Sequence, residues 1–306
     1  MAYYRGVDRY FILVEEATWN THNAAGDKIY PVAIGDDGVA MAQDPGQNIL
    51  ETNVGHGIPF YINTGISSYT GTINCLVPNG VQGLNIVKWG STITSGSIPS
   101  YTLDIKGGES ATGERWTGLT VDSMTLTSGS DSGAQRLTAA ISVIGGGFDN
   151  GVLDPVIPAE DNALYPAASG YLHSQCDLTL GAGVDATVTD LTITFTNILD
   201  VGNGTGTDPS YIQFCGRQVT LDCTIEYDAD TFRSAFTAQP PTDIILKAVY
   251  TDATPDPDET LTLDLKTAAK VTAFTPVNSL GARATSNISF LATSPSQPEG
   301  VDFSVT

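Results

Sequence analysis

Basic residues are scarce in this chain. Of its 306 residues, 13 are Lys or Arg and 34 are Asp or Glu, so the formal net charge is −21. Proteins that hold nucleic acid neutralise its phosphates with clustered Lys and Arg side chains. The composition therefore argues against specific DNA or RNA binding. Intrinsic disorder is excluded as well, because 41% of the residues are hydrophobic and only 15% are charged.

Long apolar runs are also missing. No stretch approaches the roughly 20 apolar residues that a membrane helix needs. The run Phe11–Val14 is too short, and too close to Glu15 and Glu16, to be the core of a signal peptide. We therefore expect a soluble chain with no membrane partner and no export signal. Cysteines are few and stand at no metal-ligand spacing, so we expect reduced thiols without a disulfide framework. They are Cys75, Cys176, Cys215 and Cys223.

The chain has few groups that could carry catalysis. Its three histidines lie in Gly-, Asn- or Ser-rich segments, and none stands beside a nucleophile or at metal-binding spacing, so we interpret them as exposed or locally hydrogen-bonded loop residues. They are His22, His56 and His173. We predict that the protein is not an enzyme and needs no cofactor and no metal.

Two further patterns resemble ligand loops only weakly. The runs Gly145-Gly146-Gly147 and Gly202-x-Gly204-x-Gly206 lack the lysine of a phosphate loop and the strand-then-helix context of a dinucleotide site. We interpret both as flexible connections. The acidic residues between 252 and 259 lack the glycine and the distant glutamate of a helix-loop-helix calcium site. A solvated hairpin loop fits this segment better.

Strand signals recur about every ten residues and mix threonine with β-branched or aromatic residues. This pattern predicts an all-β sandwich or barrel. Helical spacing is confined to Val81–Trp89 and Asp228–Phe236, so we expect at most one short helix in each half. The predicted strands are Thr72–Val77, Tyr101–Ile105, Leu119–Thr127, Leu137–Ile144, Val188–Asn197, Val219–Tyr227, Ile244–Tyr250, Leu261–Leu265 and Ile288–Ala292.

Four short matches between the two halves occur in the same order and indicate a tandem duplication. Their offsets of 152, 160, 150 and 147 are all near half the chain length. We predict a first β domain over residues 1–148, a linker over 149–168 and a second β domain over 169–306. The matched pairs are Thr72-Ile73 with Thr224-Ile225, Thr102–Lys106 with Thr262–Lys266, Val121–Thr125 with Val271–Thr275, and Arg136–Ser142 with Arg283–Ser289.

Several of these segments resemble the major tail tube proteins of tailed bacteriophages. The resemblance covers most of residues 60–292 and leaves residues 1–57 unmatched. In the second half it includes a strand ending in an asparagine, Val188–Asn197, and a Gly-Arg-x-Val-Thr strand in Cys215–Thr220. In the first half the matching segments are Ser100–Leu103, Gly107–Glu109, Trp116–Leu119, Val121–Leu126, Gln135–Thr138 and Ser142–Gly145.

The resemblance implies two tandem tail-tube-type β domains that build stacked rings around a channel for the genome. It also implies a virion location after synthesis in the host cytoplasm, with tape measure and tail terminator proteins as partners. An acidic wall would repel phosphates at short range, so DNA would pass without specific binding. As lumen-facing acids we predict Asp104 and Asp264, and also Asp222 and Glu226.

The duplication predicts a homotrimeric, pseudo-hexameric ring, with a true hexamer as the alternative. Long loops, especially Ala24–Gly57, would then reach a neighbouring ring or subunit. Two other functions remain open at this point. One is a secreted or surface β-sandwich adhesin or carbohydrate-binding protein, and the other is a virion decoration or baseplate component.

Overall fold

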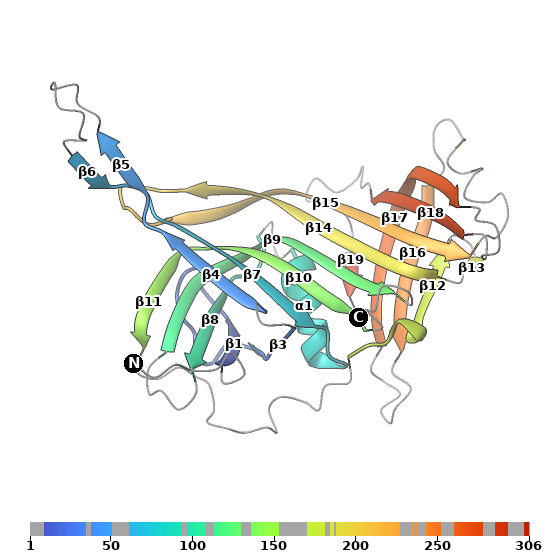
Figure 1. The fold of residues 1–306 in the computed structure, drawn as a ribbon, viewed down its shortest axis with the longest axis horizontal. Helices are drawn as coiled ribbons and strands as arrows, with labels where there is room; N and C mark the ends of the chain where they lie inside the picture. Colours follow the sequence, from blue (N-terminus) through green and yellow to red (C-terminus); the bar gives the residue numbers. More distant parts are fainter. Residues whose placement is uncertain are drawn as a thin grey trace.

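The structure of the protein is a computed structural model, shown in Figure 1. It is almost entirely antiparallel β structure, as predicted. The structure describes residues 9–34, 38–50, 61–93, 97–107, 113–129, 136–152, 170–180, 184–186, 188–226, 234, 237, 243–251, 260–277, 285–292 and 303–305.

One continuous sheet of eight strands runs through both halves of the chain (Figure 1). Its inner face carries apolar residues in regular alternation and forms most of the core. The strands, in spatial order, are β4 (Val39–Asp44), β7 (Ser68–Leu76), β10 (Thr138–Gly145), β9 (Gly113–Gly129), β14 (Val188–Gly202), β15 (Tyr211–Glu226), β18 (Thr285–Ala292) and β17 (Thr260–Val277).

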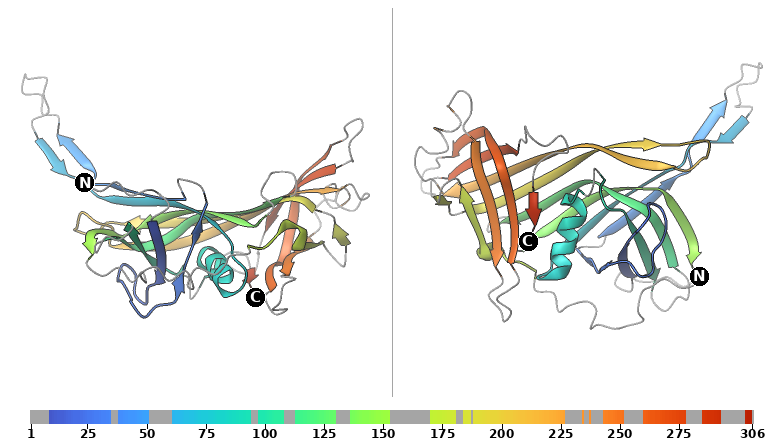
Figure 2. Two further views of the ribbon diagram at one scale, coloured as in Figure 1. Left: turned by 60° about the horizontal axis from the view of Figure 1, so that its bottom comes forward. Right: turned by 180° about the vertical axis from the view of Figure 1, so that it is seen from behind.

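Two smaller groups of strands pack under this continuous sheet, one below each half (Figure 2). The first has the order β2 (Lys28–Ile29), β1 (Arg9–Glu15), β8 (Tyr101–Gly107), the start of β9, and β11 (Gly147–Val152). The second has the order β13 (Val184–Ala186), β12 (Cys176–Leu180), β16 (Asp243–Thr251), the start of β17, and β19 (Phe303–Val305). The short strand β3 (Val32–Ala33) pairs with β7.

Strand β9 passes from the lower layer to the continuous sheet by bending at Gly118. Its φ of +68° is a conformation that glycine adopts without a steric penalty. The run Gly145-Gly146-Gly147 forms the facing corner, where β10 ends and β11 begins. A Cβ on Gly146 would lie 2.7 Å from the Trp19 ring. These glycines therefore make a close-packed corner, which differs from the flexible connection that we expected.

The two halves repeat the same strand registers. In each half the partner strand skips one residue of the longest strand, Asp122 in β9 and Thr272 in β17. The two β-bulges occupy equivalent places, and such an extra residue fixes the register of a strand pair. The equivalent cross-strand rows are Met124–Ile141–Ile73 and Phe274–Ile288–Cys223.

Two of the four sequence matches therefore hold at the level of the fold, those with offsets of 150 and 147. The match with an offset of 152 joins the correct strands, β7 and β15, but pairs Ile73 with Ile225 where the register pairs it with Cys223. The match of Thr102–Lys106 with Thr262–Lys266 is wrong as an equivalence, because the first segment lies in β8 and the second in β17. Register and bulge position pair β8 with β16 instead. The run Thr-Leu-Asp occurs in β8, β15 and β17, so it does not identify one of them.

The predicted short helix of the first half is confirmed as α1 (Val81–Ser91). Its buried residues Ile86, Val87 and Trp89 pack against the core of the first half. Most of the second predicted helix lies outside the described residues, although Ser234 and Thr237 are helical. A one-turn 3-10 helix, η2 (His173–Gln175), precedes β12.

A two-stranded arm, β5 (Gln47–Leu50) and β6 (Tyr61–Thr64), extends from the β4–β7 pair beyond the continuous sheet (Figure 2). Its base is closed by the Gly65 amide, which donates to the Gly46 carbonyl at 2.8 Å. Of the predicted linker, residues 149–152 belong to β11 and residues 153–168 lie outside the described part. The division into domains at residues 148 and 169 stays a prediction.

Candidate assembly surface

The outer face of the continuous sheet is polar and almost free of basic residues. We call it the open face. Its residues alternate with the buried core residues and are mostly Thr, Ser, Asn and Asp. Strands β4, β7, β10, β14 and β18 contain no Lys or Arg at all. A large polar face with so few cations is suited to passing a polyanion and unsuited to binding one.

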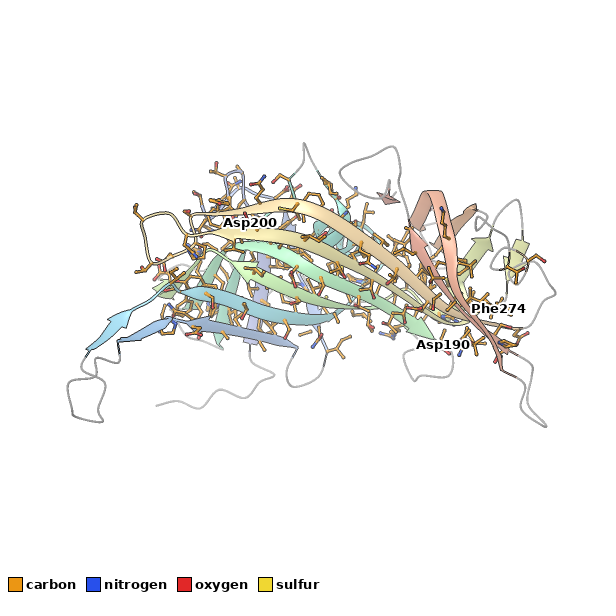
Figure 3. All side chains as sticks on the ribbon, turned by 90° about the horizontal axis from the view of Figure 1, so that it is seen from above. Asp190, Asp200 and Phe274 are labelled. Atoms are coloured by element: carbon orange, nitrogen blue, oxygen red, sulfur yellow. The ribbon has the colours of Figure 1, made fainter. Side chains whose placement is uncertain are left out.

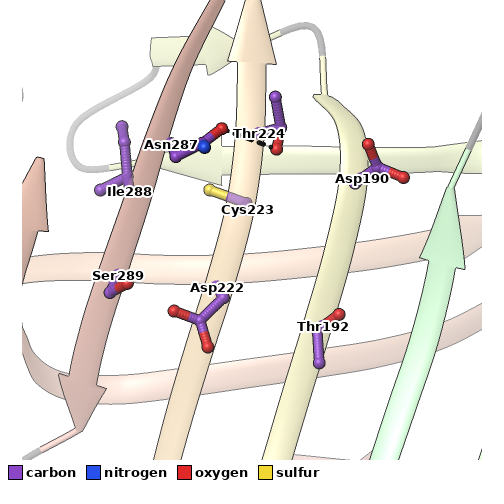
Figure 4. A pocket seen from close by; sticks show the side chains of 8 residues that line it. All are labelled: Asp190, Thr192, Asp222, Cys223, Thr224, Asn287, Ile288 and Ser289. Atoms are coloured by element: carbon purple, nitrogen blue, oxygen red, sulfur yellow. Dashed lines mark hydrogen bonds between the residues drawn. The ribbon is translucent and has the colours of Figure 1, made fainter. Parts of the chain in front are cut away.

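A hollow of about 320 Å³ lies on this face, over β14, β15 and β18 (Figure 4). Asp190 and Asp222 stand at its sides, and the Thr224 hydroxyl donates to Asn287 Oδ1 at 3.0 Å. The hollow is shallow and open. In the part of the chain that the structure describes, no three potential ligands come together to hold a metal ion.

The four predicted lumen acids fall in different environments. Asp222 is exposed and Glu226 half-buried, and both alternate with core residues of β15, which places them on the open face. Asp104 lies on β8 in the lower layer and is completely buried. Arg115 Nε and one of its terminal nitrogens donate to the two Asp104 oxygens at 2.7 and 2.8 Å. Asp264 lies in the part of β17 that pairs with β16, outside the continuous sheet. The surroundings therefore favour Asp222 and Glu226 over Asp104 as wall residues.

In the part of the chain that the structure describes, the continuous sheet ends in two unpaired edges. Among the described residues, β4 pairs only with β7, and residues 271–277 of β17 pair only with β18. The side chains of β4 and of residues 272–276 are exposed or half-buried. Figure 3 shows Phe274 at the β17 end of the sheet, with Asp190 and Asp200 at opposite ends of β14. Open edges of this kind are ready to pair with another strand.

Asn197 and Arg217 join the two halves across the middle of the sheet. The Asn197 amide donates to the Val121 carbonyl at 2.7 Å, next to the β9 bulge, and Asn197 Oδ1 accepts from Arg217 Nε at 2.7 Å. The other guanidinium nitrogens donate to the carbonyls of Gly90 and Ser91 at the end of α1. Burial lowers the pKa of Arg217 to about 10, so the group stays charged at neutral pH.

Both residues belong to the sequence segments that carried the family resemblance. Neither residue was predicted to have a role of its own. An arginine is unusual in a chain with so few cations, above all in a strand with alternating apolar residues. That feature could have identified Arg217 from the sequence. Such an arginine needs several fixed acceptors.

Glu16 is a buried carboxylate that serves the fold. It accepts hydrogen bonds from the backbone amides of Asn20 and Gly118 and from the side-chain hydroxyls of Ser100 and Thr102, at 2.7 to 2.9 Å. A carboxylate offers about four lone-pair positions, and all of them are used here. This carboxylate fixes the turn after β1 onto β8 and β9.

His173 is buried, which differs from the loop position that we expected. Its Nε2 donates to the Val188 carbonyl at 2.8 Å, and its Nδ1 lies 3.1 Å from Ser128 Oγ. Ser128 Oγ also lies 2.8 Å from the Tyr250 hydroxyl. This closed network connects the end of β9 with β14 and β16. His56 lies outside the described residues, and so does the acidic segment 252–259.

The four cysteines are free thiols. Burial raises the pKa of both Cys75 and Cys223 to about 12, so these two remain protonated and unreactive. None of the helices that the structure describes is long and apolar enough to cross a membrane.

These features together define a structural β protein with a polar, cation-poor sheet face and two free sheet edges. The chain belongs to the phage tail tube protein family, whose model matches residues 6–293. The family resemblance drawn from the sequence is therefore confirmed, and the protein is a structural component of the bacteriophage tail. No curated protein matches the chain.

Proposed function

We propose that this protein polymerises into stacked rings that form the tail tube, the conduit through which the genome leaves the virion. The observation that carries the proposal is the continuous eight-stranded sheet with a polar open face and two free edges. In a ring the open face lines the channel. Asp190, Asp222 and Glu226 then present negative charge to the passing DNA.

The preferred ring is a trimer with pseudo-hexameric symmetry. Each chain offers two four-stranded units with the same registers and the same bulge, so three chains present six similar units to the channel. Closed rings need head-to-tail contacts between subunits. The partners that follow from this role are further copies of the chain, the tape measure protein inside the tube and a terminator at its end.

The experiment that tests the proposal is negative-stain electron microscopy of the purified protein at increasing concentration. We expect rings with a central hole and tubes of stacked rings. A protein that stays monomeric at millimolar concentration, at neutral pH and moderate ionic strength, would overturn the proposal. Moderate salt is needed because a chain with a net charge of −21 repels its own copies at low ionic strength.

A further inference from the structure

We propose that the chain contains the template for its own subunit contact. The β9–β14 pairing inside the chain is repeated between chains by β17 of one copy and β4 of the next. This inference rests on the proposed ring, and it adds which strands meet and in what register. Because β4 and β17 lie at opposite ends of the continuous sheet, they can pair only between different copies (Figure 1).

The register follows from the internal repeat. The bulges and cross-strand rows make Thr125 of β9 equivalent to Thr275 of β17. Val39 faces Ile73 and Leu191 faces the equivalent residue Cys223, so Ala42 of β4 is equivalent to Thr194 of β14. Inside the chain, Thr125 faces Thr194. The equivalent contact between chains places Thr275 of one copy opposite Ala42 of the next.

The burial of side chains supports this assignment, both at the β9–β14 pairing, which we call the internal seam, and at the free edges of β17 and β4. At the internal seam Met124 and Ile193 are 0% and 1% exposed. Their equivalents at the free edges, Phe274 and Met41, are only partly buried although both pack against the core. Each end of the core is therefore incomplete in the single chain. Docking a second copy covers the apolar side chains of both ends at once.

The edge sequences are compatible with this contact. In the inferred register Asp44 faces Ala273, so no two like charges stand opposite each other among the described residues. Pro276 faces Met41 and has no amide proton, which removes at most one ladder hydrogen bond. A proline at this edge also limits pairing with unrelated strands.

Disulfide trapping tests the inferred register. The matched variant combines Ala42→Cys with Thr275→Cys, in a Cys215→Ser background that removes the exposed native thiol. Directly opposed residues have Cα atoms about 4.5 to 5.5 Å apart, within disulfide reach. The control combines Ala40→Cys with Thr275→Cys. Residue 40 lies on the same face of β4 as residue 42, two positions away, so its Cα atom is about 7 to 8 Å from that of residue 275. Both proteins are assembled under reducing conditions, examined by electron microscopy and then oxidised.

We expect covalent trimers from the matched pair, at a yield at least ten times that of the shifted pair. An equimolar mixture of the two single variants, Ala42→Cys and Thr275→Cys, should give dimers and nothing larger.

Rings that form normally but do not cross-link, or that cross-link better in the shifted pair, overturn the inference and leave the proposed function standing. If the unsubstituted parent forms no rings, the proposed function fails and the inference fails with it. If only the cysteine variants fail to assemble, high-resolution image averaging of the parent rings decides whether β17 and β4 are neighbours.

Discussion

At the scale of single residues, the most consequential side chain is Arg217, because one guanidinium holds three elements together. It connects β15 to Asn197 of β14 and to the last carbonyls of α1. Arg217→Ala leaves these acceptors buried without donors, at about 1–3 kcal/mol each when uncompensated. We expect the free energy of unfolding to fall by about 2–4 kcal/mol, as measured by urea denaturation of the unassembled chain.

The matched control is Arg217→Lys. It keeps the charge but cannot serve three acceptors arranged around a planar fork, so an intermediate loss of stability is expected. Equal stability of the wild-type protein and Arg217→Ala would show that water replaces the guanidinium without cost. That result would remove Arg217 as the connection between the two halves.

Asp122 offers a test by pH, since burial at the β9 bulge raises its pKa above the ordinary aspartate value. The folded chain then binds this proton more readily than the unfolded chain. Its contribution to stability is therefore present at low pH and is lost as the pH rises through the raised pKa. Asp122→Asn cannot ionise, so we expect a modest rise in Tm at pH 7. Solvent still screens this half-buried group, which limits the gain to about 0.5 kcal/mol or less.

The Tm difference should disappear below about pH 3, where the wild-type carboxyl is also neutral. A Tm gain that persists unchanged at low pH would mean that the substitution acts through packing and not through charge. A Tm loss at pH 7 would show that the Asp122 carboxylate makes a stabilising contact.

At the scale of elements, the central strands were predictable and the peripheral ones were not. All nine predicted strands overlap observed strands, because Thr alternates with buried residues along them, as in Leu191–Phe195. Strands β2, β3, β11 and β13 are short or rich in Gly, Asp and Asn, and they exist through pairing with distant partners. The full length of β9 was hidden by the bend at Gly118, which interrupts the alternation.

Whether a strand residue points to solvent or to another layer was also not predictable from the sequence. Asp104 alternates with Leu103 and Ile105, which suggests a solvated position. Its burial depends on Arg115 in the next strand, which sequence spacing alone does not place opposite it. Local alternation therefore identifies the two faces of a strand but not which of them meets another layer.

Among the strands that the structure describes, β5 and β6 of the arm pair only with each other. Gly46 and Gly65 are already hydrogen-bonded at its base, so residues 47–64 can be replaced by a two-residue Asn-Gly turn with little strain. We expect the free energy of unfolding to change by less than about 1 kcal/mol, since loops and tips tolerate such changes. We also expect single rings in place of tubes, because the arm extends beyond the sheet, where the neighbouring ring would stand. Electron microscopy of normal tubes from this deletion would contradict an arm function in stacking.

At the scale of the whole molecule, the two halves of the chain repeat the same strand registers, so each half has sheet edges that need a partner strand. The edge of the first unit, β9, is satisfied by β14 of the second unit, and the free edges are left only at β4 and β17 among the described strands of the continuous sheet. Adding copies head to tail moves these edges along without removing them. Only closure of the sheet on itself satisfies every strand, which is how barrels avoid open edges.

The number of chains in the proposed ring sets the width of its hole. Three chains of eight strands give a barrel of roughly 24 strands. With strands about 4.8 Å apart and tilted by about 40°, its backbone diameter is roughly 48 Å, which leaves room for a DNA duplex after side chains are added. Six chains sharing the same sheet would give roughly twice that diameter, about 95 Å. Image averaging of isolated rings measures this directly. A backbone wall near the smaller diameter supports the trimer, whereas one near the larger diameter, or six identical chains around the narrower wall, contradicts it.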